Sequence, residues 1–114
     1  MVEVVRTEEF SEWFRSLDES EQDSVAQVVD LLEEHGATLR FPYSSAIEGT
    51  SKHALRELRI QWHGRPIRVF YGFDPIRQAV LLIGGDKTGE KRFYEQMIPV
   101  AERIFDEYLQ EMAP

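Results

Sequence analysis

The first third of the chain spaces its apolar residues so as to predict one short strand and two helices. Residues 2–5 form a β-branched run that favours a strand. Thr7 is a typical N-cap residue, and the apolar positions after it recur at helical spacing: Phe10, Trp13, Phe14 and Leu17. Residues 18–21 have capping-box spacing and begin a second helix, which ends near the His-Gly pair at 35–36. We therefore expect an αα-hairpin.

The centre of the chain changes to a period of two, which is typical of strands. Apolar residues alternate with polar ones over 55–62 and again over 67–71, with turn residues at 63–66 between them. Residues 79–83 form a continuous apolar run that predicts a buried, central strand ending at the glycine pair 84–85. Because the connections between these runs are short, we expect an antiparallel meander.

The last segment returns to helical spacing, with apolar residues in steps of four and three: Tyr94, Ile98, Ala101, Phe105 and Tyr108. This rhythm continues across Pro99, so we expect either one helix that is kinked near Pro99 or two coaxial pieces. Residues 37–54 contain Pro42 and many small polar residues and favour a loop. The expected fold is a single α+β domain over residues 1–114, with element order β-α-α-β-β-β-α and an antiparallel sheet.

Composition narrows the possible functions. The 114 residues are 42% hydrophobic and include no cysteine, which excludes zinc–thiolate sites, disulfides and thiol nucleophiles. The three histidines are scattered and indicate no metal site. The chain begins without a secretory signal and has no apolar run long enough to span a membrane. We therefore expect a cytoplasmic protein with no membrane partner, metal or cofactor.

Charge is unevenly distributed along the chain. The formal net charge is −8, yet residues 51–94 contain nine basic residues against four acidic ones. Such a local positive excess favours an anion-binding site, and phosphate is the commonest anion. The overall acidity argues against tight, independent binding to long nucleic acid, which depends on many basic residues. No expected helix has a basic face, so DNA is expected to be reached only through a partner protein.

Three segments carry a family resemblance: Leu55-Arg-Glu-Leu-Arg59, Ile67-Arg-Val-Phe-Tyr-Gly-Phe-Asp74, and Ala79-Val-Leu-Leu-Ile83 with a Gly/Lys loop and helix after it. In this order they resemble the RelE/ParE superfamily of toxins from type II toxin–antitoxin systems, most nearly its HigB-like (phage Gp49-like) branch. The resemblance implies a RelE-like domain that cleaves mRNA on the ribosome without metal and so inhibits translation. It also implies neutralisation by a helix-turn-helix, HigA-like antitoxin.

Metal-free RNA cleavage would use the substrate 2′-OH as nucleophile, and arginine is suited to stabilise the resulting phosphorane because its fork meets two phosphate oxygens. Arg68 is the first catalytic candidate, since the alternation places it on the sheet face opposite Ile67 and Val69. The same parity places Arg59 on the preceding strand beside Arg68. Glu57 shares the face of Arg59, where it can pair with an arginine. The general base is left open.

Further candidates follow the last expected strand, where the family keeps basic catalytic residues. The resemblance implies catalytic roles for Lys87 and Arg92. RNA contacts are assigned to Arg56, Lys91 and Tyr94. Lys91 equally fits a solvated loop, and the place of Tyr94 in the apolar stripe of its helix favours core packing over base stacking or proton donation.

A second interpretation keeps the fold as a protein-binding module. It would be either a gyrase-directed, ParE-like toxin or a catalytically degenerate antitoxin-binding protein. Residues 1–35 carry two arginines against eleven acidic residues, which would repel RNA if the hairpin faced it. Trp13 and Phe14 are adjacent, so either one is an exposed partner contact or both belong to a wide core face.

Overall fold

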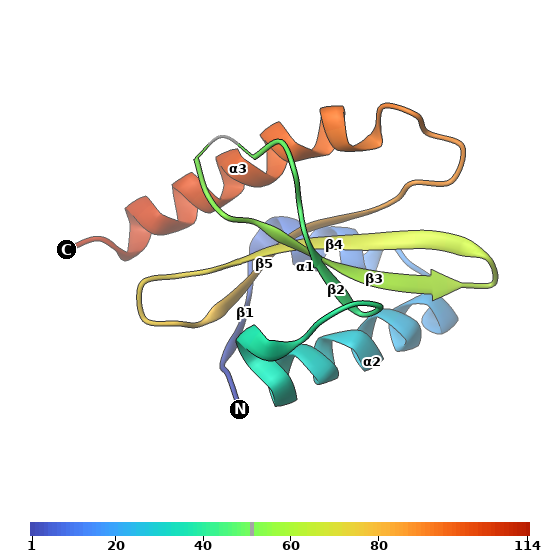
Figure 1. The fold of residues 1–114 in the computed structure, drawn as a ribbon, viewed down its shortest axis with the longest axis horizontal. Helices are drawn as coiled ribbons and strands as arrows, with labels where there is room; N and C mark the ends of the chain where they lie inside the picture. The colour runs from blue at the N-terminus through green and yellow to red at the C-terminus, as the bar shows by residue number, and fades with distance from the viewer. Residues whose placement is uncertain (51) are drawn as a thin grey trace.

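A five-stranded sheet with helices on both faces forms the protein (Figure 1). The computed structural model describes residues 1–50 and 52–114. The elements are β1 (Val4–Arg6), α1 (Glu8–Arg15), α2 (Glu19–His35), the 3-10 turn η1 (Gly36–Thr38), β2 (Ser44–Ala46), β3 (Arg56–Trp62), β4 (Arg65–Phe73), β5 (Ala79–Asp86) and α3 (Phe93–Met112).

The strand order is β1-β5-β4-β3-β2. The expected antiparallel meander is confirmed, because β3 pairs with β4 and β4 pairs with β5 in antiparallel fashion. The expectation of a wholly antiparallel sheet is wrong: β1 runs parallel to β5, with Val4 opposite Ala79. β1 and β5 are far apart in the chain, so no short hairpin connection forces them to run antiparallel.

Two boundaries also differ from the expectation. Part of the expected loop 37–54 forms the edge strand β2, which pairs antiparallel with β3 (residue 51 lies outside the described residues). The expected turn at 63–66 is tighter, because His63 and Gly64 both have positive φ (48° and 80°), as a two-residue hairpin turn requires, and β4 begins at Arg65.

The glycine pair at 84–85 does not end β5, which continues to Asp86. A Cβ on Gly84 would lie 2.4 Å from ring atoms of Trp13, and a Cβ on Gly85 would lie 3.0 Å from the ring of Phe93. The two glycines therefore let aromatic rings from opposite faces rest directly on the strand backbone.

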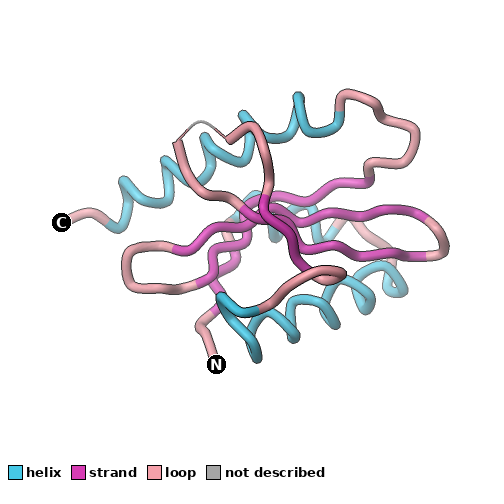
Figure 2. The backbone as a smooth tube through the Cα atoms, in the orientation of Figure 1, coloured by secondary structure: helices cyan, strands magenta, loops and turns pink. Residues whose placement is uncertain are grey.

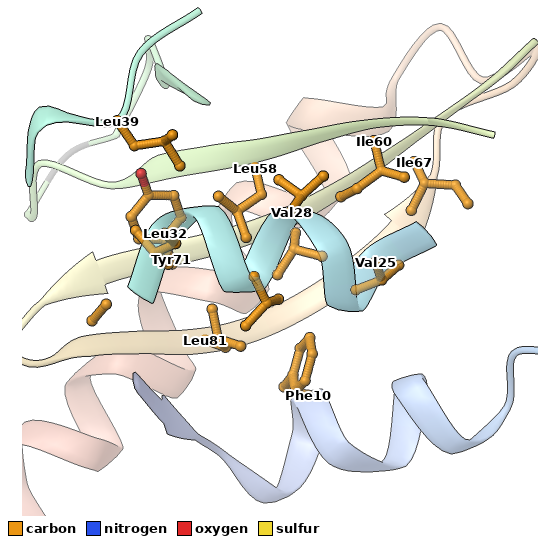
Figure 3. Close-up of a cluster of buried hydrophobic side chains, with 13 residues drawn as sticks. Phe10, Val25, Val28, Leu32, Leu39, Leu58, Ile60, Ile67, Tyr71 and Leu81 are labelled. Atoms are coloured by element: carbon orange, nitrogen blue, oxygen red, sulfur yellow. The ribbon is translucent and has the colours of Figure 1, made fainter. Parts of the chain in front are cut away.

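The sheet separates two apolar layers. On one face, α1 and α2 pack against β3, β4 and β5; Figure 3 shows Val28 and Leu32 of α2 beside Leu58 of β3. On the other face, α3 packs against side chains such as Phe70 and Val80. Figure 2 shows the same division, with α2 and α3 on opposite sides of the strands. β4 and β5 are thus buried on both faces over most of their length, whereas β3 leaves Arg59 partly exposed and Gln61 exposed on one face.

Local signals in the helices are confirmed. Thr7 caps α1 by accepting from the backbone N–H of Phe10, and Asp18 forms a complete capping box with Glu21. The helix α3 is a single element that includes Pro99.

Trp13 and Phe14 are both half-buried against the core, so the wide core face is the correct interpretation. No described helix is long and apolar enough to cross a membrane.

Candidate functional site

Two arginines lie directly opposite each other in neighbouring strands. Arg59 of β3 is the register partner of Arg68 of β4, which confirms that both are on one sheet face. That face is the one covered in part by α3, so Arg68 is buried, while the Arg59 side chain is 28% exposed. Like charges that face each other across strands are destabilising. Their placement here therefore needs a compensating anion.

Glu57 supplies the anion, two residues before Arg59 and on the same face of β3. One carboxylate oxygen lies 3.3 Å from Nη1 of Arg59 and accepts a hydrogen bond from Ser45 Oγ at 3.0 Å. The other lies 3.7 Å from Nε of Arg68 and accepts from the Tyr94 hydroxyl at 2.7 Å. A carboxylate that is only 6% exposed thus has partners on both oxygens.

Tyr94 brings the first turn of α3 into the cluster. Burial raises the pKa of Tyr94, the hydrogen bond and negative charge of Glu57 raise it further, and Arg68 acts in the opposite direction. The phenol is therefore protonated at neutral pH and donates to Glu57. Nζ of Lys87 lies 5.0 Å from the centre of the Tyr94 ring, close enough for a cation–π contact. Tyr94 packs partly in the core, as expected, but its hydroxyl reaches the charged cluster.

Arg68 has incomplete hydrogen bonding. Nη1 donates to the carbonyl of Ile67 at 3.1 Å, but the buried Nε has no hydrogen-bond acceptor among the described residues. A buried donor without an acceptor is rare and costs stability, and here the Glu57 oxygen that faces Nε lies just beyond hydrogen-bond distance, at 3.7 Å. Arg68 lines a hollow of about 140 Å³, together with Phe41, Pro42, Arg59 and Gln61. A second hollow, of about 280 Å³, is lined by Ala46, Ile47, Glu48, Glu57 and Tyr94.

The remaining sequence candidates lie outside this cluster or at its edge. Arg56 directly precedes Glu57 in β3, so its side chain lies on the opposite sheet face. There its Nε donates to Ser44 Oγ at 3.1 Å and to the Tyr71 hydroxyl at 3.3 Å. Arg92 is exposed and pairs with Glu95 at 3.0 Å rather than with Glu57. Lys91 is exposed in the same loop. Of the three basic candidates after β5, Lys87 alone contacts the cluster, through Tyr94.

Sequence reasoning missed several members of the site. Ser45 belongs to β2, which was expected to be loop, and Phe41 comes from the segment just before it. Gln61 could have been found, because Glu57, Arg59 and Gln61 recur at every second position of one strand. The central position of Glu57 follows only from the docking of α3, which places Tyr94 against it.

The charge distribution agrees with this placement of the site. The acidic hairpin of α1 and α2 packs on the sheet face that carries Leu58 and Ile60, whereas Arg59 and Arg68 are on the other face. Because the sheet lies between them, an anionic ligand on the arginines would not contact the helical hairpin. The arrangement is therefore able to bind a phosphate beside a carboxylate that is held by a tyrosine.

Known proteins are similar to this chain in sequence. Residues 12–106 match the family described as phage derived protein Gp49-like (DUF891). The chain is 38% identical to the protein named "Putative toxin HigB3" of Mycobacterium tuberculosis over 107 residues. This aligned stretch covers 93% of this chain and 92% of that protein. It is 34% identical over 104 residues to "Putative toxin HigB2" of the same organism, covering 90% of this chain and 52% of that one. The chain therefore belongs to the Gp49-like family, the HigB-like group of RelE-type toxins.

Proposed function

We propose that this protein is the toxin of a type II toxin–antitoxin system and that it cleaves mRNA on the ribosome without a metal ion. The observation that carries the proposal is the partly buried cluster of Glu57, Arg59, Arg68 and Tyr94, in which one arginine donor has no acceptor among the described residues. The related proteins named as toxins support the biological role. The cytoplasm is the compartment in which this activity would take place.

The chemistry follows from the positions of these groups. Glu57 accepts the proton of the 2′-OH, whose oxygen attacks the adjacent phosphorus. Arg68 and Arg59 stabilise the phosphorane that forms, and the bond to the 5′-oxygen breaks. The products are a 2′,3′-cyclic phosphate and a 5′-hydroxyl, whose proton comes from Lys87 or solvent. Tyr94 is a positioning residue in this scheme, because its hydroxyl holds the carboxylate of Glu57 in place.

Arg92 and Lys91 have a different part in the proposal. Both are exposed beside the start of α3 and carry positive charge near the cluster. We assign them to long-range attraction and binding of the RNA backbone, with a smaller effect on the chemical step than Arg68. Arg56 faces the other side of the sheet and takes no part.

The test is a ribosome-dependent cleavage reaction with purified protein and a translated mRNA, in which 5′ ends and 2′,3′-cyclic phosphates are mapped. We expect codon-phased cuts with wild type. Glu57→Gln and Arg68→Ala should each lower the cleavage rate about 100- to 1,000-fold, as removal of a general base or of a transition-state donor does. Arg103→Gln is the matched control, since Arg103 is an exposed arginine of α3 that pairs with Glu107. Equal cleavage by wild type and Arg68→Ala would refute the proposal.

The overall charge of −8 favours one alternative, a protein-binding toxin that does not cleave RNA. Such a protein would act on a target such as gyrase, or would only bind its antitoxin. Growth arrest on induction without any RNA cuts would support the first of these. Absence of both arrest and cuts would leave the antitoxin-binding role. A helix-turn-helix antitoxin that co-purifies with the protein and restores growth is expected under the main proposal.

A further inference from the structure

The hollow beside Arg68, here called the Phe41 pocket, places an aromatic ring and an amide that the cleavage reaction does not require beside the two arginines assigned to it. Its lining residues are Phe41, Pro42, Arg59, Gln61 and Arg68. The Phe41 side chain is 71% exposed, which is unusual for so large an apolar group. Arg59 holds the ring in place, since its guanidinium carbon lies 5.0 Å from the ring centre.

Two polar side chains of the pocket, Gln61 and Arg68, offer a ligand different kinds of contact. Gln61 is exposed at its rim and offers both an amide donor and a carbonyl acceptor. Arg68 is 4% exposed, and its Nε is the buried donor without an acceptor among the described residues. An aromatic face, an amide edge and a buried cation within one hollow match the three parts of a nucleotide that carry recognition: the flat base, its hydrogen-bonding edge and its phosphate.

We propose that the Phe41 pocket binds one nucleobase of the RNA, which stacks on Phe41, contacts Gln61 with its edge and places the attached phosphate at Arg68 and Arg59. This inference rests on the proposed function in naming RNA as the substrate. It goes further in assigning base selection to residues outside the cleavage cluster. Phe41 and Gln61 touch the substrate base but are not needed for proton transfer.

The geometry explains why a base is favoured over a bare phosphate or a carboxylate side chain. Either of those anions would engage the arginines alone and leave Phe41 as exposed to solvent as it is without a ligand. A base adds stacking on a ring that Arg59 already orients, so little ordering is required. The short reach from Gln61 to Arg68 follows from their strands: Arg68 faces Arg59, and Gln61 is two residues beyond Arg59 on the same face.

A binding experiment tests this directly with wild-type protein. The four nucleoside 3′-monophosphates and ribose 5-phosphate are titrated separately, and affinity and the Gln61 side-chain amide signal are followed by NMR. We expect at least one nucleotide to bind more tightly than ribose 5-phosphate and to shift the Gln61 amide. Phe41→Ala should weaken nucleotide binding about five- to 150-fold, the range for loss of one stacked base (~1–3 kcal/mol). It should leave ribose 5-phosphate binding unchanged.

Controls separate the proposal from other occupants. Tyr43→Ala removes a neighbouring exposed aromatic that is not part of the pocket lining and should have no effect. Gln61→Leu should reduce the differences among the four nucleotides, because the hydrogen-bonding edge is lost. Equal binding of nucleotides and ribose 5-phosphate would overturn the proposal and leave a phosphate site only. Unchanged nucleotide affinity in Phe41→Ala would also overturn it.

The cleavage assay then distinguishes this inference from the proposed function. Phe41→Ala and Gln61→Leu should still cut RNA but at an altered set of codons, whereas Glu57→Gln should not cut at comparable rates. Cleavage by Phe41→Ala at the wild-type positions with wild-type kcat/KM would refute base selection by the pocket. If wild-type protein cuts no RNA, the proposed function fails, and the nucleotide titration still decides whether the pocket binds a base.

Discussion

Replacing Glu57 by glutamine removes the carboxylate that lies between buried Arg68 and half-buried Arg59. Glutamine keeps the size of the side chain and an oxygen that can accept from Tyr94. Glu57 and Arg68 are 6% and 5% exposed, and their charged atoms are 3.7 Å apart. At this separation the attraction is about 4 kcal/mol for an effective dielectric constant of about 20. We expect Glu57→Gln to lower the free energy of unfolding by about 3 kcal/mol, because Arg68 remains buried without a counter-ion.

Replacing the partner Arg68 should lower the free energy of unfolding by less. Arg68→Met leaves Glu57 with Arg59, Ser45 and Tyr94 as partners, so we expect a loss of about 1–2 kcal/mol. The double variant Glu57→Gln/Arg68→Met removes both charges and should be within about 1 kcal/mol of wild type, since apolar groups can replace a buried ion pair without loss. The coupling between the two positions, the difference between the sum of the single losses and the loss of the double variant, is therefore about 3–5 kcal/mol.

Urea unfolding followed by tryptophan fluorescence measures these values, and the slope of the transition shows whether two-state behaviour is kept. Trp13 and Trp62 both pack against the core and report on its loss. If the losses in free energy of unfolding of the two single variants add up to that of the double variant within about 0.5 kcal/mol, the reasoning is refuted, because additivity means that the two groups do not interact. A Glu57→Gln variant as stable as wild type would refute it as well.

Three further predictions concern stability, each measured by urea unfolding. Gly84→Ala should cost about 3 kcal/mol, because its Cβ would overlap the Trp13 ring, and Trp13→Leu should recover part of this loss. Burial and Asp74 raise the pKa of Tyr108 from 10.0 to about 12, so the unfolded chain loses the phenol proton at a lower pH than the folded protein does. The free energy of unfolding should therefore fall by about 1–2 kcal/mol as pH rises from 10 to 12, and Tyr108→Phe should not show this loss. Asp18→Ala should cost about 1 kcal/mol through loss of the capping box, and an unchanged midpoint would contradict this.

The buried Glu57–Arg68 pair differs from the other groups tested here, because its role is not mainly to stabilise the fold. The Trp13 contact and the capping box contribute to stability alone. The Glu57–Arg68 pair instead adds little to stability relative to an apolar pair, while Arg68 Nε has no acceptor among the described residues. Buried polar groups that add little to stability in this way are typical of functional sites. Under our proposal the double variant would therefore be stable but inactive.

The sequence by itself determined which residues share a face. Alternation with a period of two placed Arg59 beside Arg68 and away from Leu58, and capping and apolar spacing located each helix. These features are local, because backbone geometry relates a residue to its neighbours two or four positions away. The absence of cysteine likewise excludes thiol chemistry whatever the fold.

Only the tertiary structure decided what each face meets. Parity did not reveal that α3 would cover the arginine face and bring Tyr94 to Glu57, or that Phe41 would stand over Arg59. Nor did it show that Arg92 would turn outward to Glu95, or that β1 would pair in parallel with β5. Most of these contacts join segments far apart in the chain and depend on how complete layers pack. Periodicity along one segment carries no information on its partner, so the site itself emerges only when the chain is folded.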